Sequence, residues 1–265
     1  MPFAFIGFFL ATKSHNLEWI KLLYVVLCMV FARSAAMGFN RYIDRDIDKE
    51  NERTSSVREI PNGTITAQNA LIFVIINSLL FITTTYLINT LCFALSPIAL
   101  IVILGYSFTK RFTALCHFIL GLGLALSPIG AYLAVSGEFE LIPILFSAAV
   151  LFWVSGFDII YSLQDEQFDK TQKLHSIPVF MGKKNALQLS NVLHLISILI
   201  LAYAGTLGEF GKLYWLGFSI FCGLLIYQHT LVKHNDLSKV NLAFFTTNGI
   251  ASVIFGTFVI FDLLL

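Results

Sequence analysis

Charged residues are scarce in this chain. Asp, Glu, Lys and Arg make up 12% of its 265 residues, about half the share in a soluble domain. The basic residues are scattered over the loops, which excludes the clustered basic surface of a nucleic-acid-binding protein. Paired cysteines are also absent: none of the four cysteines belongs to a CxxC pair, and all lie in apolar runs. They are therefore interpreted as reduced packing residues, not as a disulfide framework or a metal site.

Hydrophobic residues fill most of the sequence. They account for 57% of the chain, and the mean hydropathy is +0.80, which predicts an all-α polytopic membrane protein with a single domain over residues 1–265. The expected helices are 2–12, 19–40, 69–88, 91–108, 114–136, 141–163, 185–207, 213–232 and 240–262. The first run is shorter than the ~20 residues that cross a bilayer. Either the native start lies further upstream, or the first helix is truly short.

The positive charges are sorted by loop. Four alternate segments, which follow the second, fourth, sixth and eighth runs, contain five, two, four and two of the 17 Lys and Arg residues. The positive-inside rule places these segments in the cytoplasm. We therefore expect a bacterial-type inner-membrane protein whose second and sixth runs end on the cytoplasmic side.

Two acidic motifs follow these two runs. The first contains Asn40, Asp44 and Asp48, and the second contains Asp158, Tyr161, Asp165 and Asp169. Residues spaced by three or four positions line one face of a helix, where stacked carboxylates repel one another. A divalent cation between them removes that repulsion, and Mg²⁺ bound together with phosphate oxygens suits such carboxylates. The alternative interpretation is that Asp44, Asp46 and Asp48 are only a solvated helix end. Asp46 lies off the acidic face and is expected to be solvated, as are Glu59 and Glu166.

Basic residues near these motifs complete a site for an anionic ligand. Arg53, Arg58 and Lys110 can neutralise the charge that the cations leave. Arg33 lies inside the second run, two turns before Asn40, and a charge inside a membrane span predicts a functional site. We expect Arg33 to bind an acceptor's carboxylate or phenolate oxygen, with an ion pair to Asp158 or to another acid of the two motifs as the alternative. His117 and His194 are lone histidines in apolar runs and are expected to be hydrogen-bonded core residues.

Three stretches of the chain resemble the motifs of one family. They run from Asn40 to Gly63, from Tyr106 through Lys110 to Thr113, and from Asp158 to Asp169. In order and spacing they resemble the UbiA-type intramembrane aromatic prenyltransferases, and the third is closest to the 4-hydroxybenzoate polyprenyltransferase-like branch of quinone biosynthesis. Two features depart from the family pattern: one extra residue stands between Arg53 and Arg58, and Lys173 occupies a position where that branch more often has glycine.

The resemblance implies nine transmembrane helices around a cavity, in which Mg²⁺ bridges the acids and a polyprenyl diphosphate. It implies metal binding by Asn40, Asp44, Asp48, Asp158, Asp165 and Asp169. It implies substrate binding by Arg33, Asn40, Arg53, Arg58, Tyr106, Lys110 and Asp158, and catalysis by Tyr161 with the acids at 44, 48, 165 and 169.

The expected reaction is transfer of the prenyl group to 4-hydroxybenzoate or a related aromatic acid, in ubiquinone or menaquinone biosynthesis. A dihydroxynaphthoate is the alternative acceptor. A cation-coupled transporter is the alternative from another class, although it would place its acids near the membrane midplane. The lipid bilayer is the expected environment, and no obligate protein partner is expected.

Overall fold

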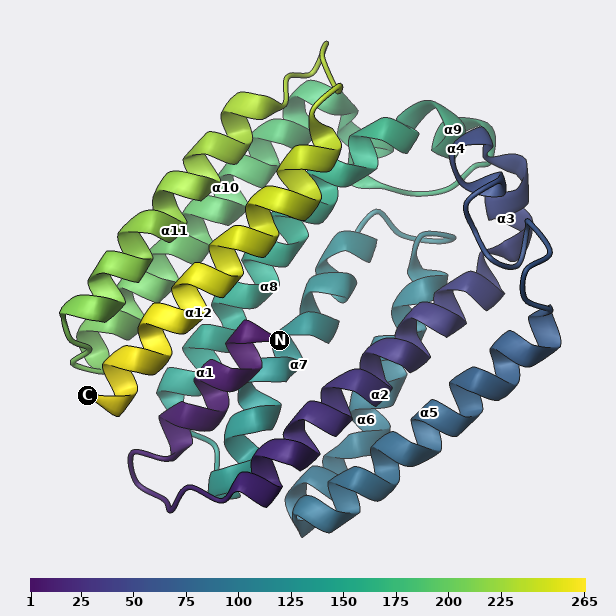
Figure 1. The fold of residues 1–265 in the computed structure, drawn as a ribbon. Helices are drawn as coiled ribbons and strands as arrows, with labels where there is room; N and C mark the ends of the chain where they lie inside the picture. Colours follow the sequence, from purple (N-terminus) through teal and green to yellow (C-terminus); the bar gives the residue numbers. More distant parts are fainter.

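Helices make up the whole architecture, and they run side by side along the molecule (Figure 1). The computed structural model describes all residues, 1–265, and contains no strand. The elements are α1 (Pro2–Ala11), α2 (Trp19–Ile43), α3 (Arg45–Glu50), α4 (Glu52–Ser55), α5 (Ala67–Ile88), α6 (Thr90–Thr109), α7 (Cys116–Ser136), α8 (Leu141–Ser162), η1 (Leu163–Asp165), α9 (Glu166–Thr171), α10 (Ile177–Leu207), α11 (Lys212–Leu231), η2 (Leu242–Thr247) and α12 (Asn248–Leu264). The all-α prediction is confirmed.

Seven of the helical segments are long and apolar enough to cross a membrane. Of the nine runs expected from the sequence, α1 is too short, and α11, which has the length of a span, is not among the seven. The count of nine spans is therefore not confirmed. The expected helix boundaries nevertheless agree with the observed ones to within a few residues, except that α10 begins at Ile177 instead of residue 185. A non-helical backbone at Gly182 (φ 77°) kinks α10 and separates its first turn from the expected helix.

The core lies where α1 meets α7, α8 and α12. The Cβ of any larger residue at Gly7 would lie 2.0 Å from the carbonyl oxygen of Pro128, so glycine lets α1 and α7 approach closely. Phe3 packs against Trp153 and Phe255, with ring centroids 5.3 and 5.8 Å apart. Aromatic pairs at these distances stabilise the packing beyond their buried area. The short first helix is thus an internal element.

A single residue joins α5 to α6. Asn89 has an extended backbone, and its side-chain oxygen caps α6 by accepting a hydrogen bond from the Cys92 amide. Its side-chain nitrogen donates to the carbonyl of Leu133 in α7 at 2.8 Å. The polar side chain at this sharp reversal therefore ties three helices together at one end of the bundle.

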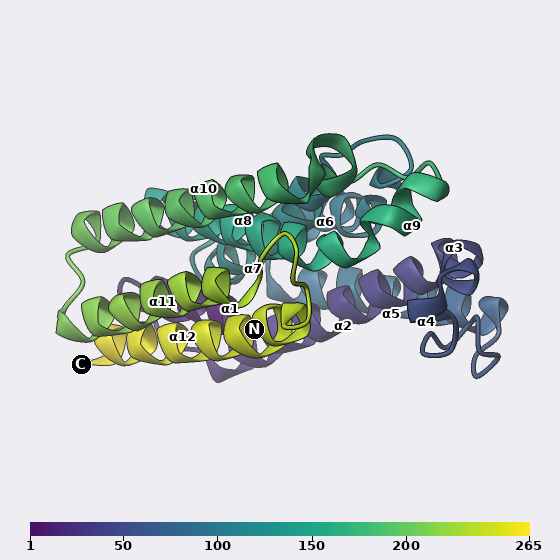
Figure 2. The same cartoon turned by 90° about the horizontal axis from the view of Figure 1, so that it is seen from above.

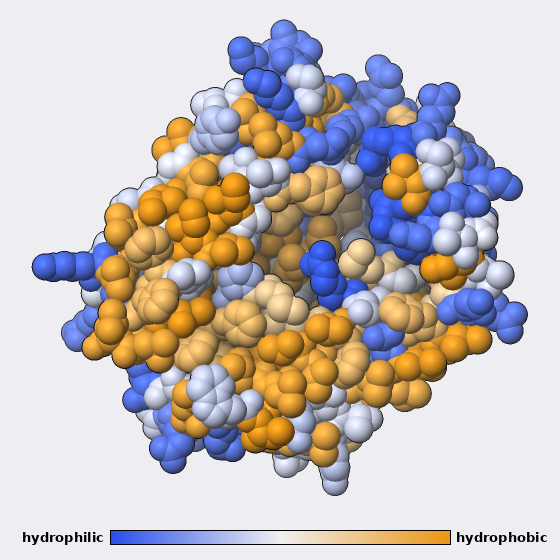
Figure 3. Space-filling model, in the orientation of Figure 1, coloured by the Kyte–Doolittle hydropathy of each residue, from blue (hydrophilic) through white to orange (hydrophobic).

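The short helices gather at the opposite end. Figures 1 and 2 both show α3, α4 and α9 together, beyond the ends of α2 and α8. In the space-filling view, hydrophilic residues collect at this end, and the face next to them is hollowed between apolar walls (Figure 3). The fold thus places its short polar elements over one end of an apolar bundle.

Candidate active site

The first acidic motif lies at a break between two helices. The sequence predicts one continuous helical face, but α2 ends at Ile43 and α3 begins at Arg45, because Asp44 leaves the helical conformation. Asn40 still donates a hydrogen bond from Nδ2 to Oδ2 of Asp44 at 2.7 Å. Asp48 lies on α3, and its backbone carbonyl accepts a hydrogen bond from the Thr54 hydroxyl at 2.9 Å.

The second motif is broken in a similar way. Helix α8 ends at Ser162, a 3₁₀ turn covers Leu163–Asp165, and α9 begins at Glu166. Asp165 therefore lies at a break, as Asp44 does, and Asp169 lies on α9. The prediction that these residues line one face of a single helix is therefore wrong, because Asp158 and Tyr161 lie on α8, Asp165 ends the 3₁₀ turn, and Asp169 lies on α9.

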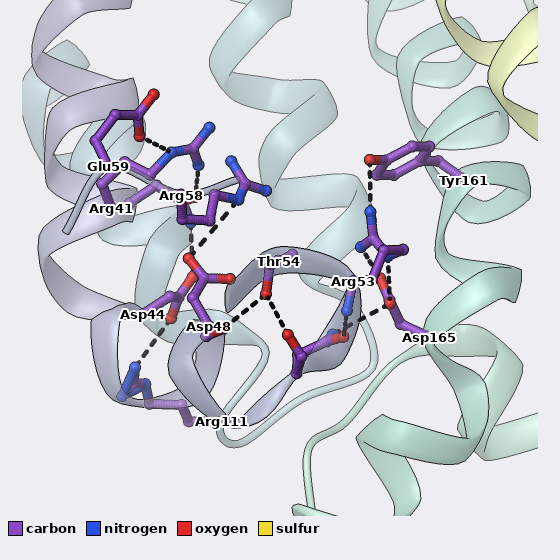
Figure 4. Close-up of polar contacts among 12 residues, drawn as sticks. Arg41, Asp44, Asp48, Arg53, Thr54, Arg58, Glu59, Arg111, Tyr161 and Asp165 are labelled. Carbon is purple, nitrogen blue, oxygen red and sulfur yellow. Dashed lines mark hydrogen bonds and ion pairs between the residues drawn. The ribbon is translucent and has the colours of Figure 1, made fainter. Parts of the chain in front are cut away.

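Each of the four acids next to the helix breaks is paired with a base. Asp44 accepts a hydrogen bond from Arg111 at 2.9 Å, and Oδ2 of Asp48 lies 3.8 Å from Nε of Arg58. Oδ1 of Asp169 lies 2.8 Å from the Lys110 ammonium. Asp165 pairs with Arg53 and completes the set (Figure 4).

Arg53 joins the two motifs. It lies on α4, directly after the first motif, and binds Asp165 through two hydrogen bonds, from Nη2 at 2.6 Å and from Nε at 3.0 Å. Its Nη1 donates to the hydroxyl of Tyr161 at 3.0 Å, and the side chain of Asn51 also donates to Asp165 at 3.4 Å. A guanidinium that binds a carboxylate with two nitrogens is held in one orientation. This contact links the segment that follows the first motif to the second motif.

The environment changes the proton affinity of these groups. Burial raises the pKa of Asp44 to about 6, against the opposing charge of Arg111, and the neighbouring Asp48 adds to the rise. Burial also raises the pKa of Asp48, against its hydrogen bond with Thr54. At Lys110 burial lowers the pKa, but the Asp169 carboxylate outweighs burial, so the pKa is raised overall. The carboxylates of the first motif are thus costly to ionise without a further positive charge.

Several buried carboxylate oxygens lack a hydrogen-bond donor. They are Oδ2 of Asp48 and both oxygens of Asp169. The Lys110 ammonium lies 2.8 Å from Oδ1 of Asp169 and forms an ion pair with this fully buried carboxylate. Oxygen ligands of this kind suit Mg²⁺. No group of three or more acidic, histidine or cysteine side chains converges on one point as the side chains lie, because bases occupy the space between the acids.

Asp158 has a partner that the sequence did not predict. Its Oδ2 lies 2.7 Å from Nδ1 of His117, which is buried. The other ring nitrogen of His117, Nε2, accepts a hydrogen bond from the Ile177 amide at 3.3 Å, so Nδ1 carries the proton and donates to Asp158. The expectation that His117 is a hydrogen-bonded core residue is confirmed. The alternative pairing of Arg33 with Asp158 is wrong.

Arg33 forms no ion pair and is exposed on α2, on the same helical face as Val30 and Met37. An arginine without a carboxylate partner inside a membrane span remains available for an anionic ligand. Tyr106 lies in the last turns of α6, one turn before Lys110, and its carbonyl accepts a hydrogen bond from Thr109.

Some side-chain contacts were not predicted from the sequence, and others were predicted wrongly. Arg111 was not expected to bind Asp44. Glu166 was expected to be solvated, but it is buried and pairs with Lys170 at 2.6 Å and Lys183 at 3.7 Å. Its position four residues before Lys170 was the available signal. Asp46 is exposed, as expected.

An all-helical membrane bundle with two acidic motifs and a set of basic residues at one end defines an intramembrane prenyltransferase. The chain belongs to the UbiA prenyltransferase family, whose sequence pattern matches residues 1–250. The prediction of this family from the motifs is confirmed.

Curated relatives and solved structures agree with this assignment. The chain is similar to a 4-hydroxybenzoate octaprenyltransferase of Paraburkholderia phytofirmans, with 30% identity over 93% of this chain and 85% of the relative. A 4-hydroxybenzoate octaprenyltransferase of Vesicomyosocius okutanii is 32% identical, over 91% of this chain and 88% of the relative. The fold is similar to that of a UbiA homologue from Aeropyrum pernix, with a TM-score of 0.89, 29% identity, and 98% and 95% of the two chains covered. A UbiA homologue from Archaeoglobus fulgidus bound to DMAPP and Mg²⁺ has the same fold, with a TM-score of 0.72 at 21% identity, covering 100% and 97% of the two chains.

Proposed function

We propose that this prenyltransferase transfers a polyprenyl group from polyprenyl diphosphate to 4-hydroxybenzoate or a closely related aromatic acid, with Mg²⁺, in quinone biosynthesis. The relatives that share about 30% of its residues along most of its length are 4-hydroxybenzoate octaprenyltransferases. The observation that carries the proposal is the alternation of acids and bases where the two motifs meet, with Arg53 bound to Asp165. Such a set can hold divalent cations and a diphosphate at once.

The acids and Asn40 would hold the metal. Asp44, Asp48, Asp165 and Asp169 would supply carboxylate oxygens at two neighbouring helix breaks. Oδ2 of Asp48 and both oxygens of Asp169 accept no hydrogen bond, so a cation that displaced Arg58 and Lys110 would satisfy them. Bound Mg²⁺ would stabilise the negative charge that develops on diphosphate as it leaves. Asp158 was also predicted as a metal ligand. Because one of its oxygens accepts from His117, at most its other oxygen would serve the site.

The basic residues would bind the diphosphate. Arg53, Arg58 and Lys110 now neutralise the acids, and each can turn to phosphate oxygens once a cation binds those acids. The Tyr161 hydroxyl accepts its hydrogen bond from Arg53, so its own proton is free to be donated to a diphosphate oxygen. Tyr106, one turn from Lys110, would contact the same substrate.

The reaction forms one carbon–carbon bond. The bond between the prenyl carbon and the diphosphate oxygen breaks, diphosphate leaves with the electron pair, and the ring carbon of the acceptor attacks the allylic cation. The ring carbon then loses its proton. Arg33, exposed and without a carboxylate partner, would bind the carboxylate of the acceptor. Water must be excluded to protect the cation, and the apolar walls next to the polar end favour this (Figure 3).

The test is prenyl transfer in isolated membranes. Membranes that contain the protein would receive a polyprenyl diphosphate, Mg²⁺ and a mixture of 4-hydroxybenzoate and dihydroxynaphthoate, and products would be identified by mass spectrometry. Prenylated 4-hydroxybenzoate is expected, with loss of product after chelation by EDTA and recovery on adding Mg²⁺. Prenylation of dihydroxynaphthoate alone would refute the proposed acceptor, and full turnover in EDTA would refute the metal requirement. The positive-inside argument further places the active site on the cytoplasmic side, which cysteine labelling of intact cells at position 49 would test.

A further inference from the structure

A second polar pocket lies between α10 and α11, away from the acidic motifs. Its volume is about 430 Å³, and its polar lining consists mainly of Lys184, Gln188, Asn191, His229, Lys233 and His234. It lies at the end of the bundle to which the short helices belong, because the connection from α11 to η2 is at that end (Figure 1). Seven of its nine lining residues are polar or charged, which is unusual on the outer side of membrane helices.

The charge of the pocket is positive. Lys184 and Lys233 both line it, no carboxylate does, and neither lysine forms an ion pair. The adjacent lysine, Lys183, is instead bound to Glu166. The nearest acid along the chain, Asp236, uses its Oδ1 to accept two hydrogen bonds from Ser238. Two free ammonium groups therefore face the same space, as in basic pockets between membrane helices that bind lipid head groups.

A hydrogen-bond chain orients His229 at the inner wall of this pocket. Nε2 of His194 donates to the carbonyl of Trp153 at 3.1 Å, which leaves Nδ1 of His194 as an acceptor. Nε2 of His229 donates to it at 2.8 Å. The remaining nitrogen of His229 is then an acceptor for a hydroxyl group of a ligand. The pocket is thus built for an anion that also carries a hydrogen-bond donor.

The surface of α10 changes from polar to apolar along one stripe. Lys184, Gln188 and Asn191 follow one another at helical spacing, and Leu195 and Leu199 continue on the same side. Both leucines are exposed, at 54% and 58%, and face the hydrocarbon in a membrane. A polar stripe that continues into an exposed apolar stripe matches a phospholipid, whose phosphate head group would lie on the polar part and whose acyl chains would lie on the apolar part. A free phosphate would contact the polar part only.

We infer that this pocket binds the head group of an anionic phospholipid with hydroxyl groups, such as a phosphatidylglycerol. The phosphodiester lies between Lys184 and Lys233, its hydroxyl groups reach His229 and the amides of Gln188 and Asn191, and its chains lie against Leu195. Such a lipid holds the end of α11 against α10. This binding does not depend on the acceptor or on prenyl transfer.

The test is lipid titration of the purified protein by native mass spectrometry. Dioleoylphosphatidylglycerol is expected to bind the wild-type protein more tightly than dioleoylphosphatidylcholine. Each ammonium at a membrane surface contributes about five-fold in affinity, so replacing both lysines (Lys184→Gln with Lys233→Gln) should weaken phosphatidylglycerol binding roughly 25-fold. The control is Lys13→Gln with Lys212→Gln, which makes the same change in charge after α1 and at the start of α11, at the other end of the bundle.

Three results would overturn the inference. The first is equal binding of the two lipids, and the second is equal loss of affinity in both double variants. The third is competition by inorganic phosphate at the concentration at which the lipid binds, which would identify a soluble anion as the ligand. A single variant, Gln188→Leu, serves if the double variant does not fold, and it should weaken phosphatidylglycerol binding while phosphatidylcholine binding stays unchanged.

Discussion

Replacement of Arg53 by alanine tests whether a divalent cation can neutralise the Asp165 carboxylate in place of this arginine. Arg53 makes two charge-assisted hydrogen bonds to Asp165, at 2.6 and 3.0 Å, and one to Tyr161. The Asp165 side chain is only 12% exposed, so its charge would be left in a poorly solvated position with one weak donor, Asn51. Each such bond contributes about 1.5–3 kcal/mol when buried.

Solvent reduces this value, because the Arg53 side chain is 34% exposed. We expect Arg53→Ala to lower the free energy of unfolding by about 2–4 kcal/mol without metal. Each kcal/mol corresponds to about 2 °C or more in the melting temperature of a chain of this size. A fluorescence-monitored melt in detergent with EDTA would measure the difference. Arg53→Lys, which keeps the charge but loses the two-point contact, should fall in between.

Added Mg²⁺ and a prenyl diphosphate analogue should then reduce the stability difference between Arg53→Ala and the wild type, because the cation neutralises Asp165 in place of the guanidinium. The same variant should lose at least about 100-fold in kcat, since the group that we propose to stabilise the departing diphosphate is missing. A deficit that stays constant at saturating Mg²⁺ would refute the idea that cation and arginine exchange at Asp165. A variant as stable as the wild type in EDTA would refute the structural part of the reasoning.

Three further predictions concern single residues. The pKa of Asp44 is raised by burial to about 6, above its ordinary value, so the stability that its protonated form contributes is fully present below pH ~4 and is lost as the pH rises through 6. Without metal, the free energy of unfolding should therefore fall by about 2–3 kcal/mol over this window, as measured by melts at several pH values. Asp44→Asn should remove this dependence of stability on pH. Arg33→Ala should raise the KM for the aromatic acid far more than the KM for prenyl diphosphate in steady-state assays, and equal increases would exclude acceptor binding. Lys173 has a φ of 54°, which costs a non-glycine residue about 1 kcal/mol, so Lys173→Gly should raise the melting temperature, whereas an unchanged or lower value would contradict the strain.

Most of the fold could be predicted because hydrophobic run length is a direct requirement of the bilayer. Even the reversal at Asn89 was predicted, as the break between the expected helices 69–88 and 91–108 in a stretch without charged residues. The glycine normally found at position 173 was also informative, since the structure has a left-handed backbone there. The breaks at Asp44 and Asp165 could not be predicted, because the residues around both are compatible with a continuous helix.

Side-chain partners were harder to predict than helices. Asp44 and Arg111 are 67 positions apart, and Arg53 and Asp165 are 112 apart. Sequence spacing identifies neighbours within one helix, but such distant pairs depend on how the helices are packed. His117 illustrates this: its type and its apolar surroundings predicted a buried residue with a hydrogen bond, yet only the packing of α7 against α8 identifies Asp158 as its partner.

The one-residue reversal at Asn89 limits how the cavity can change its width. With no slack between α5 and α6, and with the Asn89 amide anchored to α7, these three helices are fixed to each other at that end. Their other ends are joined by longer segments, residues 56–66 before α5 and 110–115 after α6. Admission of a bulky lipid substrate therefore has to come from spreading at the end that holds the aspartates, so that loading a substrate and rearranging the charged groups become a single motion.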